Sequence, residues 1–574
     1  FLNSGGIIGY ASDLFELLSH QKISDEDDDQ LYYTNIFLDK ATRDKYKIKL
    51  DYRASIFQNL LATTDDLEID FEKGILKNIV YNTQPLILHG NGPAKINLLN
   101  YGNYLANHWN PIKGCIACTE NNILLEQLDE ANYPEVLVGV FIAQPTPFIH
   151  EYLEKLLTLD YPNKKLRFFI YNSVQYHIPH VKEFVEKLRS KSYLGLKEIK
   201  NEDEINEARA RSIAINYCLL KNCDYFFNVD SLAHIDDPKT LKTLIKLNRT
   251  VIAPMLVRPY KAWSNFWGAV SKDGFYQRAF DYFDIINNDR RGIWNVPYIS
   301  SAYLINSSIL KEHKPNYEME DMDSDMSFSQ FFRNEGIFMY VANIYDFGHL
   351  INPEAFDSSR TNPDMYEIFS NRLDWEERYI HPDYPENFNP EKKPLQPCPD
   401  VYWFPVVTPI FCQQLIEIVE GFGKWSDGSN KDERLVGGYE NVPTRDIHMN
   451  QVNYDNIWME FLRLFVRPLQ EHVFTGYFHD PPRSLMNFVI RYKPNEQPSL
   501  RPHHDSSTYT INLALNTPNV DYEGGGCHFI RYNCSVTDTK LGWLLMHPGR
   551  LTHYHEGLQV VRGVRYIMIS FVDP

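Results

Sequence analysis

The sequence contains 574 residues, of which 43% are hydrophobic and 14% aromatic. A chain of this length exceeds a single hydrophobic core, so we expect about three domains of roughly 100 to 250 residues each. The net charge of −18, from 75 acidic and 57 basic residues, leaves no basic footprint for nucleic acid and disfavours an anionic membrane surface. We also expect no transmembrane segment, because the most apolar run, 136–143, is far shorter than the roughly 20 residues that cross a bilayer.

The pattern of segments in the first part of the chain resembles the C-terminal part of an α/β domain. The chain begins at Phe1 in what we interpret as the middle of a strand and turn, and we therefore interpret it as N-terminally truncated. Strand-like stretches follow, with an acidic run at 25–29 and the segment LILHGNGP at 86–93.

The central part of the chain alternates between strand and helix patterns. Residues 135–143 predict a buried strand, and apolar residues at helical spacing predict helices over 148–159 and 181–194. Strand followed by helix predicts a second α/β domain with a largely parallel sheet. A stretch rich in Pro and Asn, 381–399, predicts the loop that enters the last domain.

The pattern changes after Val401. Helices are expected near 409–423 and 454–469. Six short strand patterns follow, each bounded by Gly, Pro, Asn or Asp: 485–492, 508–515, 526–532, 542–547, 551–555 and 565–572. Short strands at this spacing favour a double-sheet jelly roll over a parallel sheet.

The cysteines indicate an oxidising compartment. All eight fall into sequence-local pairs: Cys115 with Cys118, Cys218 with Cys223, Cys398 with Cys412, and Cys527 with Cys534. An even count at short spacing predicts disulfides, and disulfides predict a secretory location. A zinc site at the first pair is the alternative, but no second pair of matching spacing lies nearby. Three N-glycosylation triplets fit the same compartment: Asn248, Asn306 and Asn533.

His503 and Asp505 form the first half of a candidate metal site. Two residues apart on an expected strand, they project from the same face, so an imidazole and a carboxylate can reach one ion. The triplet is weak evidence alone, because 234–236 and 381–383 match it too. Only the triplet at 503–505 leads into an apparent strand and is followed, about fifty residues later, by a further strand histidine.

That histidine is His555, and Arg565 lies ten residues beyond it. Two histidines and one carboxylate on one face of a metal leave positions open, the arrangement that suits non-haem iron(II). A 2-oxo-acid co-substrate with a distal carboxylate requires a planar cation in the pocket, and Arg565 on the following strand can supply it.

Two neighbouring histidines compete with these assignments. His504 is a rival to His503, and His553 is a rival to His555. The ten-residue spacing to Arg565 favours His555, because the residue ten positions after His553 is the uncharged Gly563.

Several segments carry a resemblance to a known family. In the last domain they are 397–404, 437–443, 501–508 (RPHHDSST), 524–527, 547–557 (HPGRLTHYHEG) and 565–566, and in the central domain 263–268 and 294–299. They closely resemble the procollagen-lysine 2-oxoglutarate 5-dioxygenases, the lysyl hydroxylases of collagen, over the whole chain. The resemblance implies two α/β glycosyltransferase-like (Rossmann-type) domains, the first N-terminally truncated, followed by a double-stranded β-helix (jelly-roll) dioxygenase domain. The implied ranges are 1–115, 130–365 for a non-catalytic accessory domain, and 366–574.

The resemblance also implies an activity. It is hydroxylation of collagen lysine in X-Lys-Gly sequences to 5-hydroxylysine, using iron(II), 2-oxoglutarate, O2 and ascorbate and releasing succinate and CO2. The implied partners are procollagen chains and a second copy of the chain, and the implied location is the endoplasmic reticulum lumen, with peripheral membrane association or secretion as variants. Carried over by position, the iron ligands are His503, Asp505 and His555, the 2-oxoglutarate anchor is Arg565, and Tyr492 and Asn512 line the co-substrate pocket.

The same family carries a glycosyltransferase domain that uses manganese and a UDP-sugar. Its acidic run and its His-Gly-Asn-Gly-Pro segment match 25–29 and 89–93, so His89 is implied as a manganese ligand. The implied nucleotide-sugar contacts are Gly92, Pro93, Ala94 and Lys95. The family's paired-aspartate motif lies upstream of Phe1, so we expect galactosyl or glucosyl transfer only in the full-length protein; a solvated loop is the alternative for the acidic run.

The central domain also departs from a catalytic glycosyltransferase. Where such a domain would place an Asp-x-Asp metal motif, this sequence has Asp230-Ser231-Leu232, and we expect the domain to be non-catalytic. Two alternatives to a hydroxylase remain: a collagen-binding scaffold, or a glycosyltransferase with an inactive dioxygenase domain.

Overall fold

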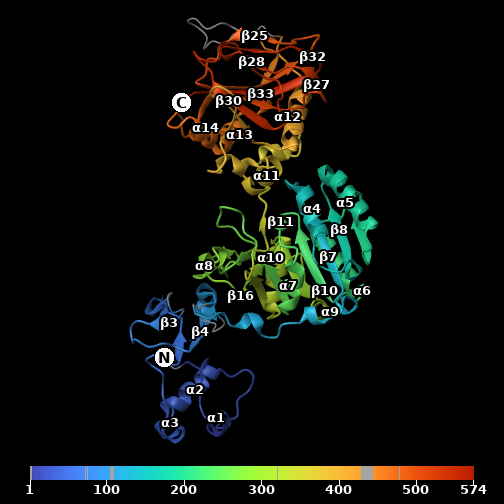
Figure 1. Ribbon diagram of the computed structural model, residues 1–574. Helices are drawn as coiled ribbons and strands as arrows, with labels where there is room; N and C mark the ends of the chain where they lie inside the picture. Colours follow the sequence, from blue (N-terminus) through green and yellow to red (C-terminus); the bar gives the residue numbers. More distant parts are fainter. Residues whose placement is uncertain are drawn as a thin grey trace. The chain divides into compact units, whose positions relative to one another are not determined.

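The computed structural model describes the chain except residues 1–2, 71–72, 74, 104–108, 111, 320, 428–441, 443, 478 and 574. The segment 437–443, which contributed to the family resemblance, therefore lies outside the described residues apart from Val442. The chain divides into two compact units, Phe1–Gln144 with Ile149–Leu350, and Pro145–Phe148 with Ile351–Pro574 (Figure 1). Among the described residues, the helices lack the combination of length and apolar character that would let one cross a membrane.

The first unit begins with small elements around small cores. Three helices open it: α1 (Ala11–Leu18), α2 (Asp29–Leu38) and α3 (Lys40–Tyr46). Two two-stranded ladders follow, with β1 (Phe57–Asn59) parallel to β4 (Ile87–His89) and β2 (Leu67–Asp70) antiparallel to β3 (Ile75–Asn78). A 3-10 helix, η2 (Gly92–Tyr101), comes directly after β4 and contributes Ala94 and Tyr101 to their shared core.

The main body of the first unit is an eight-stranded sheet. In spatial order its strands are β16 (Ile293–Val296), β19 (Met339–Ala342), β12 (Val251–Pro254), β18 (Ala302–Asn306), β10 (Tyr225–Asp230), β7 (Val136–Ile142), β8 (Leu166–Asn172) and β9 (Gly195–Ile199). The four strands β9, β8, β7 and β10 are parallel, but β18 runs antiparallel to both of its neighbours and β16 antiparallel to β19. Because β12 and β19 are parallel to each other and share the direction of β10, six of the eight strands run the same way, and the prediction of a largely parallel sheet is confirmed, with β18 and β16 reversed.

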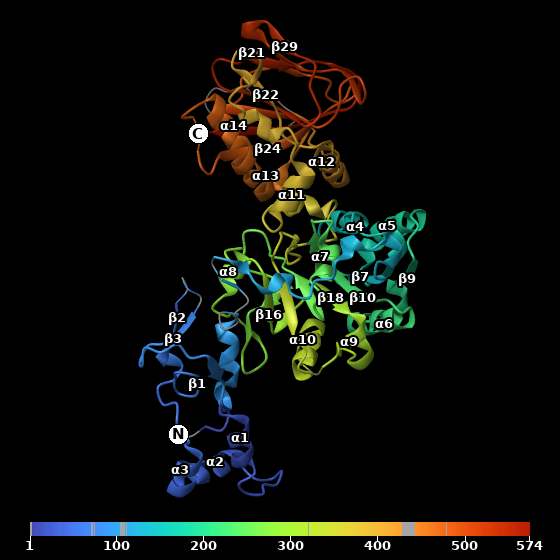
Figure 2. The ribbon, with the colours of Figure 1, turned by 60° about the horizontal axis from the view of Figure 1, so that its bottom comes forward.

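Helices cover both faces of this sheet. In Figure 2, α4 (Ile149–Leu157), α5 (Ile178–Ser190) and α7 (Thr240–Lys246) lie above the central strands, and α6 (Glu207–Leu220), α9 (Ser307–Glu312) and α10 (Ser324–Asn334) lie below them. Successive side chains of a strand point to opposite faces, and β7 accordingly sends Val138 and Val140 into one core and Leu137 and Phe141 into the other. The strand predicted at 135–143 and the helices predicted at 148–159 and 181–194 are confirmed within a few residues.

The second unit is a jelly roll of two facing sheets. The larger sheet has the order β21 (Leu395–Cys398), β22 (Val401–Pro405), β30 (Trp543–Pro548), β26 (Tyr509–Ala514), β33 (Arg565–Asp573), β24 (Arg483–Tyr492) and β23 (Asp446–His448). The smaller sheet has the order β25 (Leu500–His503), β31 (His555–Gly557), β28 (Cys527–Phe529) and β29 (Cys534–Val536). A short ladder joins β27 (Tyr522–Gly524) to β32 (Val560–Gly563).

One face of the larger sheet carries the core and the other carries the pocket. The core face packs against α11 (Arg372–Tyr379), α12 (Pro409–Phe422), α13 (Asp455–Phe461) and α14 (Arg467–Val473). Along β26, Ile511 and Leu513 enter this core, whereas Thr510 and Asn512 line the pocket on the opposite face. The period of two therefore gives this strand an apolar side and a polar side.

Two sequence expectations in this unit need correction. The helix predicted at 454–469 is α13 and α14 separated by a π-helical turn at Leu462–Val466. The strand predicted at 551–555 instead begins at His555 and continues to Gly557, because the preceding residues form the turn that leads into it.

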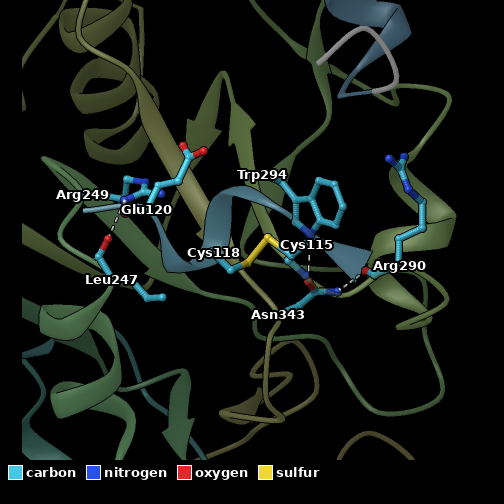
Figure 3. Close-up of a disulfide and its surroundings, with 9 residues drawn as sticks. Cys115, Cys118, Glu120, Leu247, Arg249, Arg290, Trp294 and Asn343 are labelled. Atoms are coloured by element: carbon cyan, nitrogen blue, oxygen red, sulfur yellow. Dashed lines mark hydrogen bonds between the residues drawn. A yellow bond between two sulfur atoms is a disulfide. The ribbon is translucent and has the colours of Figure 1, made fainter. Parts of the chain in front are cut away.

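The disulfide between Cys115 and Cys118 is present, as the spacing predicts. Figure 3 shows it beside Trp294, whose indole Nε1 donates to Asn343 Oδ1 at 2.8 Å. A Cβ added to Gly292 would stand 3.3 Å from Cys115 Sγ, so the disulfide packs closely on the start of β16.

The other predicted pairings are wrong. Cys398 is bonded to Cys534, 136 residues away, rather than to Cys412. Cys412 is buried in α12, and Cys527 remains a thiol on β28. The remaining two predicted partners, Cys218 and Cys223, are buried free thiols. Sequence proximity fails here because β21 of the larger sheet lies beside β29 of the smaller sheet.

Candidate metal centre

Three ligand-type side chains converge between β25 and β31. His503 ends β25 and is the direct antiparallel partner of His555, the first residue of β31. Asp505 follows β25 by two residues, and its Oδ1 lies 3.3 Å from His503 Nε2 while its Oδ2 lies 3.7 Å from His555 Nε2. One donor atom from each of these buried residues lies within 4.8 Å of the other two. The strand ends at His503, so a turn, rather than strand alternation, brings Asp505 to the histidines.

Hydrogen bonds orient both imidazoles. Nδ1 of His503 lies 2.8 Å from the carbonyl oxygen of Arg501, and Nδ1 of His555 lies 2.8 Å from that of His553. A carbonyl oxygen can only accept a hydrogen bond, so the Nδ1 atom of each histidine carries the proton. In the neutral imidazole, Nε2 then has a free lone pair on the side of Asp505. Burial lowers the pKa of His555, which favours this neutral form.

The carboxylate completes a donor set suited to a cation. Burial alone would raise the pKa of the Asp505 carboxyl, but the charge of His555 when it is protonated, and a hydrogen bond from protonated His503, lower it well below its usual range. Two neutral imidazole nitrogens and an ionised carboxylate are all electron-pair donors, so they do not pair with one another. A metal ion bound between them would compensate for their burial. The residues present therefore fit an iron(II) ion.

The structure separates these residues from their sequence rivals. His504 is exposed and its ring lies 4.8 Å from that of Tyr554. His553 uses both ring nitrogens elsewhere, with Nε2 2.9 Å from the Pro399 carbonyl oxygen and Nδ1 2.8 Å from the Thr552 hydroxyl. Neither belongs to the three-residue donor group.

A pair of hydroxyls lies behind Asp505 and escaped the sequence reasoning. Thr510 donates a hydrogen bond to Asp505 Oδ2, and the Ser507 hydroxyl lies 2.8 Å from that of Thr510. All three residues are buried. The only sequence signal was a polar residue at an inward position of the strand predicted over 508–515.

The donor group opens into a cavity of about 480 Å³ in the second unit. Arg565, the first residue of β33, lines this cavity and pairs across the sheet with Tyr492, the last residue of β24. Its guanidinium lies 5.6 Å from the centre of the Tyr492 ring and donates to the Gly526 carbonyl oxygen at 3.4 Å. Its buried Nε has no hydrogen-bond partner within the described part of the chain. A buried cation with an unused donor fits a ligand carboxylate.

Tyr492 and Asn512 both line the same cavity. Burial raises the pKa of Tyr492 to about 12, so its hydroxyl keeps its proton at neutral pH. Asn512 Nδ2 donates to His547 Nε2 at 3.2 Å, and His547 Nδ1 in turn lies 2.8 Å from the Pro548 carbonyl oxygen. Sequence reasoning also missed Thr539 and Cys527 as residues that line the cavity.

The residues expected to bind a nucleotide sugar lie in the first unit. His89 ends β4, with Nδ1 3.2 Å from Asn59 Oδ1. Gly92, Pro93 and Lys95 are exposed at the start of η2, but Ala94 is buried in the small core. Over the part of the chain that is described, His89 does not belong to a group of three potential metal ligands.

The acidic run at 25–29 has a local structural role. Asp28 caps α2 by accepting from the Leu31 amide at 2.8 Å, and Asp27 accepts from the Ser24 amide at 2.7 Å. Aspartate at a helix N-cap satisfies amide groups that the helix leaves unpaired. At least two of its carboxylates therefore shape the turn before α2.

Comparisons with known proteins agree with this arrangement. Residues 1–115 match the family model described as the PLOD GT domain, 123–369 match the glycosyltransferase family 25 N-terminal domain, and 484–574 match the 2OG-Fe(II) oxygenase superfamily. The last match implies iron(II) and 2-oxoglutarate as the groups that the jelly roll takes.

Curated relatives match this chain along its whole length. The chain is 50% identical over 578 residues to the procollagen-lysine,2-oxoglutarate 5-dioxygenase of Drosophila melanogaster, covering 100% of this chain and 79% of that protein. It is 47% identical over 580 residues to the multifunctional procollagen lysine hydroxylase and glycosyltransferase of Rattus norvegicus, covering 100% of this chain and 78% of that protein. With this identity along its whole length and an oxygenase domain that holds the converging donors, the chain belongs to the procollagen-lysine,2-oxoglutarate 5-dioxygenase family.

Proposed function

We propose that this chain hydroxylates lysine in X-Lys-Gly sequences of procollagen to 5-hydroxylysine, consuming 2-oxoglutarate and O2 and releasing succinate and CO2. The observation that carries the proposal is the convergence of His503, Asp505 and His555 beside the buried Arg565 in one cavity. The names of the relatives supply the substrate, since they are procollagen lysine hydroxylases.

In this proposal the two Nε2 atoms and the Asp505 carboxylate hold iron(II). Two histidines and one carboxylate leave positions open for a co-substrate, and the bound ion supplies the activation of oxygen. Arg565 binds the distal carboxylate of 2-oxoglutarate, because its guanidinium is buried at the cavity wall with an unused donor. The protonated Tyr492 hydroxyl and the Asn512 amide line the remaining wall and orient the co-substrate.

Further assignments accompany this proposal. Ascorbate as a reductant, procollagen chains as partners and a homodimer follow from membership of the family. Two disulfides support an oxidising compartment, for which we propose the endoplasmic reticulum lumen. The domain ranges we propose are 1–115, 130–365 and 366–574.

For the full-length protein we also propose sugar transfer from a UDP-sugar with manganese, in the domain to which residues 1–115 belong. His89 would ligate the manganese, and Gly92, Pro93 and Lys95 would contact the nucleotide from the exposed start of η2. Ala94 would contribute through its backbone only, since its side chain packs in the core.

The test is succinate formation from 2-oxoglutarate with a Lys-Gly collagen peptide, with and without added iron(II). Asp505→Ala abolishes turnover, whereas Asp383→Ala, in the matching triplet at 381–383, leaves it unchanged because that carboxylate is exposed. A collagen-binding scaffold with an inactive site would instead bind the peptide without forming succinate in the unaltered chain. That result would contradict the proposal.

A further inference from the structure

The carboxyl end of β10 is the place where the central domain should hold a divalent cation. Residues 123–369 match a glycosyltransferase family, and the expected Asp-x-Asp motif falls at 230–232, of which only Asp230 is acidic. Asp230 ends β10, which lies between β18 and β7 within the eight-stranded sheet. Open α/β sheets bind ligands beyond the carboxyl ends of their parallel strands. Asp230 thus stands where a metal ligand would stand.

A buried arginine, Arg211, already forms an ion pair with the Asp230 carboxylate. Arg211, on α6, has 1% of its side chain exposed, and its Nη2 lies 2.9 Å from Asp230 Oδ1. The same Nη2 lies 2.5 Å from Glu207 Oε1, one helical turn earlier, and Nε donates to that oxygen at 3.0 Å. One guanidinium therefore joins the carboxylates of a strand end and a helix.

The remaining contacts of Arg211 fix its position. Nη1 donates to Asn228 Oδ1 at 2.8 Å, and Asn228 Nδ2 donates in turn to Asp230 Oδ1 at 3.0 Å. The guanidinium also lies 4.6 Å from the centre of the Phe141 ring. Four of the five N–H donors of Arg211 and one flat face of its guanidinium are thus engaged within the chain, so we regard it as a structural cation.

A third acidic side chain, Asp325, interacts with this arginine. Burial raises the pKa of Asp325 well above its usual range, although Arg211 opposes that shift. Its Oδ1 is buried without a hydrogen-bond partner in the described part of the chain. Oxygen atoms that could ligate a metal ion are thus present, but the cation that they contact is the guanidinium of Arg211. The arrangement does not fit a divalent ion, because the guanidinium holds the oxygen atoms that would ligate it.

We infer that Arg211 takes the place of the divalent cation in the central domain and closes this site to metal ions and to metal-bound nucleotide sugars. The positive charge stabilises the carboxylates of Glu207 and Asp230 that would otherwise repel each other. The inference is independent of the hydroxylase activity proposed for the second unit. It explains how the domain keeps a glycosyltransferase-like fold without the ion.

The test is a gain of metal binding on removal of the arginine. The full chain is equilibrated with Mn²⁺, and bound manganese per chain is counted by atomic emission after removal of free ion. Arg211→Ala gains one manganese ion relative to the unaltered chain, because oxygen ligands from Glu207, Asp230 and Asn228 become available. Adding Asp230→Asn to that variant loses the extra ion.

Two controls separate this effect from a general disturbance. Arg211→Lys keeps the positive charge and gains no manganese, and Arg209→Ala, at an exposed position of the same helix, gains none. Arg211→Met, which retains the bulk of the side chain, is examined in the same way in case Arg211→Ala does not fold. Added Mn²⁺ raises the unfolding temperature of whichever uncharged variant folds.

Either of two results overturns the inference. The first is that neither uncharged variant gains manganese or manganese-dependent stability. The second is that Asp230→Asn in the otherwise unaltered chain removes a bound manganese ion, since Asp230 would then ligate metal in the presence of Arg211.

Discussion

His503 and His555 are paired directly across two antiparallel strands, with their ring centres 4.5 Å apart. The pairing joins residues that the chain separates by the whole β26 to β30 segment. A slip of one residue in this register would turn one imidazole to the opposite face of its sheet. The geometry of the candidate metal centre therefore depends on strand pairing as much as on the identity of the residues.

Thr510 is expected to tune metal affinity through Asp505. Its hydroxyl donates to Asp505 Oδ2, so Thr510→Val leaves that oxygen without its partner and frees the carboxylate to rotate. Loss of such a supporting hydrogen bond typically weakens metal binding by about 10- to 100-fold. Calorimetric titration with Fe²⁺ under anaerobic conditions measures this change. Thr510→Ser retains the hydroxyl and should retain most of the affinity; equal losses in both variants would show that packing, not the hydrogen bond, matters.

Arg565 is expected to set the affinity for 2-oxoglutarate without affecting the metal. Arg565→Lys keeps a positive charge but loses the planar fork that binds a carboxylate through two parallel hydrogen bonds. We expect KM for 2-oxoglutarate to rise by about tenfold or more, the equivalent of at least one charge-assisted hydrogen bond, while Fe²⁺ affinity stays the same. Arg562→Lys is the control, since Arg562 is exposed and pairs with Glu523. An unchanged KM would remove Arg565 from the co-substrate site.

The sequence predicted the components of this site better than their arrangement. The spacing of His503, Asp505 and His555 identified a donor set because ligand chemistry restricts residue type and number. The expected same-strand geometry of His503 and Asp505 was wrong, since β25 ends at His503. Thr510 could not be recognised, because its role depends on a hydrogen bond formed across a turn.

The fold shows the same division between local and long-range information. The continuous apolar run in β7 and helical periodicity in α4 and α5 are local patterns, and they predicted those elements within a few residues. The reversed direction of β18 and the pairing of Cys398 with Cys534 depend on which strands become neighbours. The spacing of residues along the chain does not determine which strands become neighbours.

The two disulfides are expected to differ in their contribution to stability. In the chain-entropy model a cross-link restricts the unfolded chain more when it closes a longer loop. Cys398 and Cys534 are 136 residues apart, whereas Cys115 and Cys118 are three apart. Removing the first bond should cost about 5 kcal/mol and removing the second about 2 kcal/mol. Urea unfolding of the double alanine variants measures both, and a larger loss for the short loop would contradict the model.

Glu367 is expected to make the stability of the second unit depend on pH. Burial raises the pKa of Glu367 to about 7 from its ordinary value of 4.5, although Asn371 Nδ2 donates to its carboxylate at 2.8 Å. The folded state therefore binds a proton more tightly than the unfolded state does. The cost of ionising this side chain is absent below the unfolded pKa, grows between pH 4.5 and about 7, and is complete above that range.

Glu367→Gln removes the ionisation and leaves an amide oxygen that can still accept from Asn371. The variant should be close to the unaltered chain in stability near pH 4.5 and more stable by about 2 to 3 kcal/mol at pH 8. Urea unfolding at a series of pH values, monitored by tryptophan fluorescence, measures the difference; the second unit contains the buried Trp375 and Trp458. The exposed Glu391→Gln should leave the pH profile unchanged. A Glu367→Gln profile parallel to that of the unaltered chain would mean that Glu367 ionises equally easily in the folded and unfolded states.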